Sequence, residues 1–382
     1  MDEPRAAKPE ELPEVLKLIN ATFPPRGRFA FQMENKFPLF LSEGNLNNVW
    51  VFSDQGKPVS VCSYYPCRIN VQGSSIAAAS IGAVCTEPSY RGQGLSSRLL
   101  DNIEVKAAQE GINLLLISGT RGLYIRRKCA IVGGFSRSDI KPNAEVPPFV
   151  LDDFAPADLQ EMAILYNREP ARFERTRVEF DALVQAGILS DYNFTYKLYL
   201  TRKNAQMTSY IVLRIIHKEL VWGEVVEYAG ERADIVAAVK LIAFRENLPF
   251  IQLHAHLSDP IIGSMDEPSI LVPQEGMVKI LRPAALLECL RSYFEQSTLR
   301  HSGFDFQVSE GQVGELSLKL GNESLSIADP ILLSWLIFGF PEDARMEEEK
   351  FFSSLDTRQE MKAFFSSVFP IHFPFAGNLN YI

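Results

Sequence analysis

The feature that most constrains the fold of this chain is a glycine-containing loop at residues 87–94. An apolar stretch before it predicts a strand over residues 75–86, and apolar residues at helical spacing after it predict a helix that begins near residue 95. Gly92 and Gly94 let the backbone between these elements fold so that several N–H groups point in one direction. The sequence therefore predicts a strand, a tight loop and a helix in direct succession.

A loop of this kind can bind a diphosphate, because the first N–H groups of a helix are unpaired and its dipole is positive at that end. The alternative is an ordinary strand-to-helix turn, which a bare Gly-x-Gly pattern would favour. Here Arg91, both glycines, the preceding strand and the following helix agree. We therefore predict a pyrophosphate site at residues 91–96.

The loop lies in the first of three predicted units, since 382 residues suffice for about two or three domains. For the first unit we expect helices over 12–22 and 29–41, strands over 48–53, 58–71 and 75–86, the helix after the loop, and a buried strand over 113–118. The second unit repeats this order, with helices over 157–167 and 177–188, strands over 195–201, 207–217 and 220–228, a helix over 235–246 and a strand over 250–256. The remainder predicts a small mixed domain with a helix over 284–294, strands over 315–320 and 323–328, and helices from 330 and near 358–368. We thus expect an α/β (α+β) chain.

Composition excludes several classes of protein. A net charge of -9 argues against nucleic acid as a partner, because phosphate binding needs a concentrated basic surface. The start of the chain lacks the order of a signal peptide, and no apolar run approaches the roughly 20 residues of a membrane span. The five cysteines are scattered and odd in number, which indicates free thiols. We therefore expect a cytoplasmic protein.

Residues 91–96 resemble motif A of the GNAT N-acetyltransferases, whose pattern is Gln/Arg-x-x-Gly-x-Gly/Ala. Arg91, Gly94 and Ser96 stand at its defined positions, and Ser96 departs from the pattern while remaining compact. The order of the whole chain is similar to that of the Eis-type (enhanced intracellular survival) acetyltransferases. The segments 166–170 and 378–382 fit the same resemblance.

This resemblance implies two tandem GNAT-like mixed-sheet domains followed by a small sterol-carrier-like α/β domain. The first, over 1–146, would bind acetyl-CoA and catalyse; the second, over 147–278, would lack a cofactor loop; the third would span 279–382. It implies an N-acetyltransferase that uses acetyl-CoA as co-substrate, with direct attack by an aminoglycoside-, polyamine- or lysine-like amine, and a homo-oligomer. The alternative is a non-catalytic CoA-sensing or lipid-binding protein on a GNAT scaffold.

The resemblance also implies the cofactor contacts. The pantetheine arm of CoA would pair with the strand before the loop, the pyrophosphate would accept from the loop and the helix start, and the loop after the buried strand would complete the site. These cofactor-binding residues are Val84, Cys85, Thr86, Arg91, Gly92, Gln93, Gly94, Leu95, Ser96, Ser97, Gly119 and Thr120.

Two groups are expected to move protons. Tyr124 follows the buried strand, and a tyrosine suits protonation of a leaving thiolate because its usual pKa is near 10. The resemblance implies that Tyr124 is the general acid and that the terminal carboxylate on Ile382 is the general base. The alternatives are a packing role for Tyr124 and a tail that packs as an edge of the third domain.

Other residues are not expected to carry chemistry. Residues 229–234 stand where the loop should recur, but they lack one glycine and include two carboxylates, so we expect no CoA there. His254 and His256 share one strand face without an evident third ligand, and we expect no metal. Residues 126–128 are expected to be a solvated basic turn, and Cys85 has no histidine placed to activate it. The apolar stretch 331–340 is expected to be core, with a lipid groove as the alternative.

Overall fold

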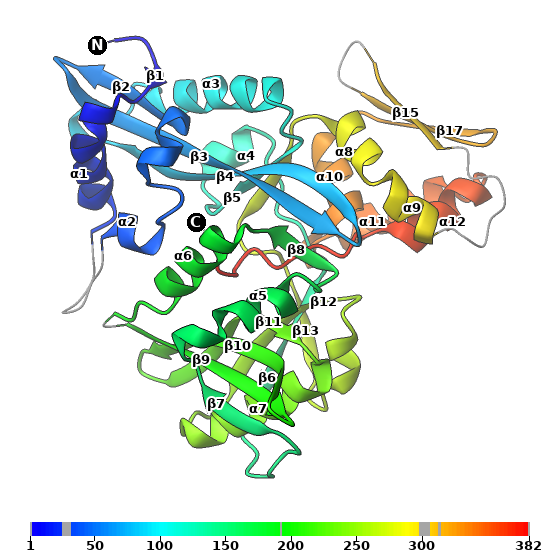
Figure 1. Ribbon diagram of the computed structural model, residues 1–382. Coiled ribbons are helices and arrows are strands. Elements are labelled where there is room, and N and C mark those ends of the chain that lie inside the picture. The colour runs from blue at the N-terminus through cyan, green and yellow to red at the C-terminus, as the bar shows by residue number, and fades with distance from the viewer. Residues whose placement is uncertain (1, 25–31, 192, 298–305, 312–314, 381–382) are drawn as a thin grey trace.

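The computed structural model describes residues 2–24, 32–191, 193–297, 306–311 and 315–380. Two units, each built around a sheet, lie one above the other in Figure 1, and a smaller group of helices and strands lies beside them. The C-terminal segment runs between the two units toward the middle of the molecule. Within the described ranges, no helix combines the length and the apolar character that a membrane span requires.

The first sheet has the order β1-β2-β3-β4-β5-β14, and β8 pairs with β3. Helix α1 (Leu12–Thr22) packs against Val51 and Val61, whereas α3 (Leu95–Gln109) packs against Phe52 and Cys62. Neighbouring residues on a strand point to opposite faces, so the two helices cover opposite sides of the sheet. The strands are β1 (Arg5–Ala6), β2 (Val49–Asp54), β3 (Lys57–Val71), β4 (Ser74–Thr86), β5 (Leu114–Ile117), β8 (Ala171–Glu174) and β14 (Met277–Ile280).

The helix expected over 29–41 is wrong in extent. Residues 29–31 lie outside the described residues, and α2 covers only Met33–Lys36. Phe37 has a non-helical backbone, with φ -125° and ψ 62°. The reason is Pro38, since a proline disfavours the helical conformation in the residue before it.

The second sheet has the order β13-β6-β12-β11-β10-β9-β7. The succession β9–β10–β11–α7–β12 matches β2–β3–β4–α3–β5, because in both cases antiparallel strands lead to a helix and then to a parallel neighbour. The strands are β6 (Phe135–Ile140), β7 (Val150–Asp153), β9 (Phe194–Lys203), β10 (Gln206–His217), β11 (Val221–Gly230), β12 (Ile251–His256) and β13 (Ser269–Val272). The helices of this unit are α5 (Leu159–Tyr166), α6 (Arg177–Gly187) and α7 (Arg232–Arg245).

The sheets exchange strands across the expected boundaries. β6 belongs to the second sheet although it precedes residue 146, while β8 and β14 return to the first sheet. The two units are therefore interlocked, and the domain limits at 146 and 278 stay a prediction.

The third region packs on the first sheet. One cluster of buried side chains joins Leu114 and Leu116 of β5 to Phe294, Ile337 and Phe365. The helix expected over 284–294 is in fact two helices, α8 and α9. Strand β15 and helix α11 were not predicted. Helix α11 buries only Phe351, so its sequence shows little apolar periodicity. The elements are α8 (Pro283–Cys289), α9 (Arg291–Ser297), β15 (Phe306–Glu310), β16 (Leu316–Leu320), β17 (Glu323–Ile327), α10 (Pro330–Phe338), α11 (Arg345–Ser354) and α12 (Gln359–Val368).

Candidate active site

The first sheet opens between β4 and β5. Their parallel pairing ends at Ile81↔Ile117, and a register shift between β3 and β4 follows. Ala83 has a positive φ of 49° there, which is the geometry of a β-bulge. As a result Val84 packs toward α3 and Cys85 toward α1. In the described part of the chain, no strand pairs with the β5-side edge of residues 84–86, which leaves main-chain groups for a ligand.

The loop after β4 is tied back to the strand end. Gly92 and Gly94 have φ of 80° and 73°, which glycine adopts without strain. Arg91 Nε donates to the Thr86 carbonyl oxygen at 3.1 Å, and the Thr86 and Ser96 hydroxyls lie 2.9 Å apart. These contacts hold the start of α3 against the end of β4.

The N–H groups of residues 92–97 are available to a ligand. The first hydrogen bond inside α3 runs from the Arg98 N–H to the Gly94 carbonyl at 3.1 Å. Among the described residues, no protein acceptor engages the N–H groups before it. A row of unpaired donors at the positive end of a helix of this length is suited to a diphosphate.

A cavity of about 820 Å³ joins the strand edge, the loop and Tyr124. Its lining contains these predicted site residues: Val84, Cys85, Thr86, Arg91, Gly92, Gly94, Leu95, Ser96, Ser97 and Tyr124. Three predicted residues, Gln93, Gly119 and Thr120, do not line it. The sequence did not predict these further lining residues: Thr22, Phe23, Pro24, Met33, Tyr90, Arg121 and Leu123. For Thr22 and Phe23 the only signal was that α1 ends there.

Tyr124 is held by its surroundings. It lies on α4 (Gly122–Arg126), is buried, and packs in one cluster with Cys62 and Cys129. A Cβ at Gly119 would come within 2.9 Å of its ring, so Gly119 makes room for the ring. Burial raises the pKa of Tyr124 to about 12. The hydroxyl is therefore protonated at neutral pH and can act as a proton donor.

A base is missing from the described lining of the cavity. No carboxylate or imidazole stands among those residues, and burial raises the pKa of Cys85 to about 11, so its thiol is protonated at neutral pH. Ile382 lies outside the described residues. The described chain ends at Asn380, which shares a cavity of about 20 Å³ with Ser80 of β4 and with Ser118.

The corresponding loop of the second sheet is occupied by the chain itself. The Gly230 N–H donates to Glu169 Oε1 at 2.9 Å, and Arg232 Nη2 donates to Glu169 Oε2 at 2.6 Å. Arg232 Nε also donates to Asp259 at 2.9 Å. A carboxylate thus takes the position that an anionic ligand would need.

The remaining candidates have structural partners. Arg127, from the basic turn, pairs with Glu104 at 2.8 Å and with Asp101 at 2.7 Å. His254 and His256 stack on aromatic rings of the C-terminal segment. In the described ranges, no group of three or more His, Cys, Asp or Glu side chains is arranged to hold a metal.

A bulged strand, a glycine loop and a helix with unpaired N–H groups line one cavity, which is the arrangement expected of a site for a diphosphate-bearing cofactor. Residues 3–130 match the model of the Acetyltransferase (GNAT) domain. The chain therefore carries a GNAT acetyltransferase domain at its N-terminal end. No curated protein matches the chain in sequence.

Solved structures share the fold over nearly the whole chain. Eis1 from Mycobacterium abscessus is 13% identical, with a TM-score of 0.63, over 99% of this chain and 100% of its own. A GCN5-related N-acetyltransferase from Kribbella flavida is 13% identical, with a TM-score of 0.63, over 100% and 98%. Another from Anabaena variabilis is 13% identical, with a TM-score of 0.63, over 88% and 89%. The mixed α/β architecture beyond residue 130 is thus shared with these proteins as a fold.

Proposed function

We propose that the protein is an N-acetyltransferase that transfers the acetyl group of acetyl-CoA to an amine. The observation that carries this proposal is the 820 Å³ cavity, where the free edge at residues 84–86, the N–H groups of residues 92–97 and the buried Tyr124 meet. A cofactor with a diphosphate and an amide-bearing arm matches the loop and the strand edge in that order. The thioester at the end of the arm would then lie near Tyr124.

The reaction needs two proton movements. The amine nitrogen attacks the thioester carbonyl, the carbon–sulfur bond breaks, and the CoA sulfur takes the Tyr124 proton. The excess proton on the amine must pass to a base. The Tyr124 hydroxyl is protonated at neutral pH and lines the same cavity, so this side chain can supply the first proton.

We assign the second transfer to the terminal carboxylate of Ile382. Two observations support it: the described cavity lining offers no carboxylate or imidazole, and Asn380 lies beside Ser80 and Ser118 where β4 and β5 separate. Two residues span at most about 7 Å, so the chain end stays close to Asn380. A terminal carboxyl is ionised at neutral pH and can accept the proton.

The acceptor class follows from the same chemistry. A base and a thioester in one cleft suit a primary amine, and the net charge of -9 favours a cationic acceptor. We propose an aminoglycoside-, polyamine- or lysine-like amine. We further propose a cytoplasmic homo-oligomer, on the basis of the unpaired cysteines and the likeness to Eis-type enzymes.

The test is release of CoA thiol from acetyl-CoA in the presence of each amine class. We expect amine-dependent release, and a fall in kcat of about 100-fold for Tyr124→Phe with CoA affinity nearly unchanged. Tight CoA binding without release for any amine would instead favour a non-catalytic CoA-sensing protein.

A further inference from the structure

The second sheet opens in the same way as the first. β11 pairs with β12 only at Gly223↔Ile251 and Glu224↔Gln252, and a register shift interrupts the β10–β11 ladder beside Val225. By topology this opening corresponds to the cofactor opening of the first sheet. It holds a cavity of only about 80 Å³, against about 820 Å³ in the first sheet.

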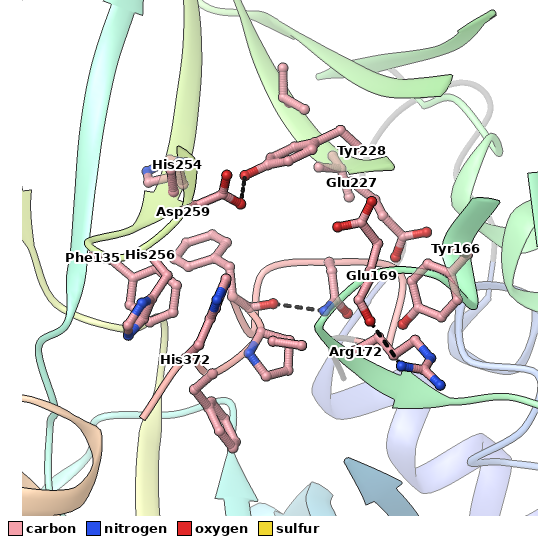
Figure 2. Close-up of a pocket in the computed structure, with 18 of the residues that line it drawn as sticks. Phe135, Tyr166, Glu169, Arg172, Glu227, Tyr228, His254, His256, Asp259 and His372 are labelled. Carbon is pink, nitrogen blue, oxygen red and sulfur yellow. Dashed lines mark hydrogen bonds between the residues drawn. The ribbon is translucent and has the colours of Figure 1, made fainter. Parts of the chain in front are cut away.

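The C-terminal segment, residues 372–380, fills this opening. Phe375 stacks on His254 at 4.6 Å between ring centroids, and His372 stacks on His256 at 4.8 Å. Figure 2 shows His372 beside His256, with Tyr228 and Asp259 across the cavity. The opening that is proposed to bind a cofactor in the first unit is therefore filled by the C-terminal segment in the second unit.

Gln274 and Arg175 fasten the segment with directional bonds. Gln274 is 3% exposed; its Nε2 donates to the Pro374 carbonyl at 3.0 Å, and its Oε1 accepts the Ala376 N–H at 3.0 Å. Arg175 Nε donates to Asn380 Oδ1 at 2.6 Å. These bonds hold both halves of the segment.

Arg175 is itself rigidly placed. Its guanidinium is 1% exposed and donates to both carboxylate oxygens of Glu227, at 3.0 and 2.6 Å. It also lies over the Tyr166 ring, 4.0 Å from the centroid. A buried cation held by these three contacts has little freedom, so its bond to Asn380 fixes the position of that residue.

The segment leaves the second unit toward the first. Leu379 packs against Gly187 of α6, where a Cβ would come within 2.3 Å of its side chain. Asn380 then lies beside Ser80 and Ser118, at the mouth of the opening between β4 and β5. The described part of the path therefore ends where β4 and β5 separate.

We propose that the second unit uses its opening to hold the C-terminal segment in place of a cofactor, and that Arg175 and Gln274 are positioning residues for acetyl transfer. They keep the chain end at the active site without touching the cofactor cavity. This inference rests on the proposed role of the terminal carboxylate.

The test compares Asn380→Ala, which removes the acceptor of Arg175 Nε but keeps the Arg175–Glu227 pair, with Asn380→Asp, which keeps an acceptor. Gln274→Met removes both tail bonds at similar volume. We expect Asn380→Ala and Gln274→Met to lower kcat about tenfold with the KM for acetyl-CoA unchanged, and Asn380→Asp to retain activity. A carboxypeptidase should release Ile382 about fivefold faster from the two impaired variants, with melting temperatures close to the parent.

A variant with residues added after Ile382 separates the two proposals. If the extension leaves turnover intact, the terminal carboxylate is not the base. If the extension abolishes turnover while Asn380→Ala and Gln274→Met change neither kcat nor the release rate, the positioning inference is overturned. An equal fall in kcat for Asn380→Asp and Asn380→Ala also contradicts it, because the bond to Arg175 would then not matter.

Discussion

The loops that follow β4 and β11 have the same architecture, but within the described chain only the second has its N–H donors paired with a side chain of the protein. Each joins a bulged strand to a helix, beside a parallel strand that separates from it. After β4, glycines at 92 and 94 leave a row of donors facing a large cavity. After β11, Gly230 and Arg232 donate to Glu169, and the tail fills the opening.

The difference teaches that a fold supplies an anion site only where the sequence leaves its donors unpaired. Buried N–H groups need partners, and a nearby carboxylate of the chain satisfies them as a ligand would. The exposed N–H groups of the first loop are left to solvent or a ligand, while the Gly230 N–H of the second is paired within the chain. Four experiments test this contrast.

The largest effect is expected from Gly94→Val in the first loop. A β-branched residue at φ 73° is strained, so the loop has to change its backbone conformation. We expect CoA to bind about 100-fold more weakly, a loss of about 3 kcal/mol by calorimetry, with little change in melting temperature. Unchanged CoA affinity would show that this loop does not bind the cofactor.

The second loop should respond in the opposite way. Glu169→Gln keeps the shape but removes the charge that Arg232 faces, and we expect unfolding stability to fall by about 2 kcal/mol in denaturant titrations. CoA affinity should not change. Glu161→Gln is the matched control, because Glu161 pairs with Arg202 at the surface and should cost little. Weaker CoA binding in Glu169→Gln would mean that the second loop also holds cofactor.

The stacking of His372 on His256 predicts that the stability of the protein depends on pH. Burial lowers the pKa of His256 to about 3 and also lowers the pKa of His372, with Asp259 facing both rings and Arg232 facing His372. Since the unfolded histidines bind protons at higher pH than the folded ones, stability should fall as pH drops below about 6.5, by at most about 1.4 kcal/mol per pH unit for each histidine. His372→Phe should make this slope shallower while keeping the stack. If the variant shows the same slope, the pH dependence comes from groups other than His372.

The smallest effect is expected from Gly119→Ala. The added Cβ would press on the Tyr124 ring at 2.9 Å, so the ring must shift by a few tenths of an ångström. We expect kcat to fall about fivefold, with CoA affinity unchanged. Gly263→Ala is the control, because no atom lies within 4 Å of a Cβ at that position. Equal activity of the two variants would show that the Tyr124 ring position is not critical.

Much of the fold follows from local patterns. The long strands β3, β4 and β10 and the helices α1, α3 and α7 lie within a few residues of their predicted positions, because each has a continuous apolar face or an unbroken apolar run. The early end of helix α2, the split between α8 and α9, and the charged α11 were not predicted, since Pro38 and neighbouring segments decide them. Strand exchange by β6, β8 and β14 leaves no mark in their own residues.

By itself the sequence determined the strand, the glycine loop and the helix start at residues 74–97, because these elements are contiguous in the chain. It also singled out Tyr124, which the structure places in the same cavity. Only the tertiary structure decided that Glu169 fills the second loop, that Gly119 lies against Tyr124, and that Arg175 and Gln274 hold residues 374–380. Apart from the contact between Gly119 and Tyr124, these contacts join residues far apart in the chain, and their partners are fixed by how the sheets pack, which no local spacing records.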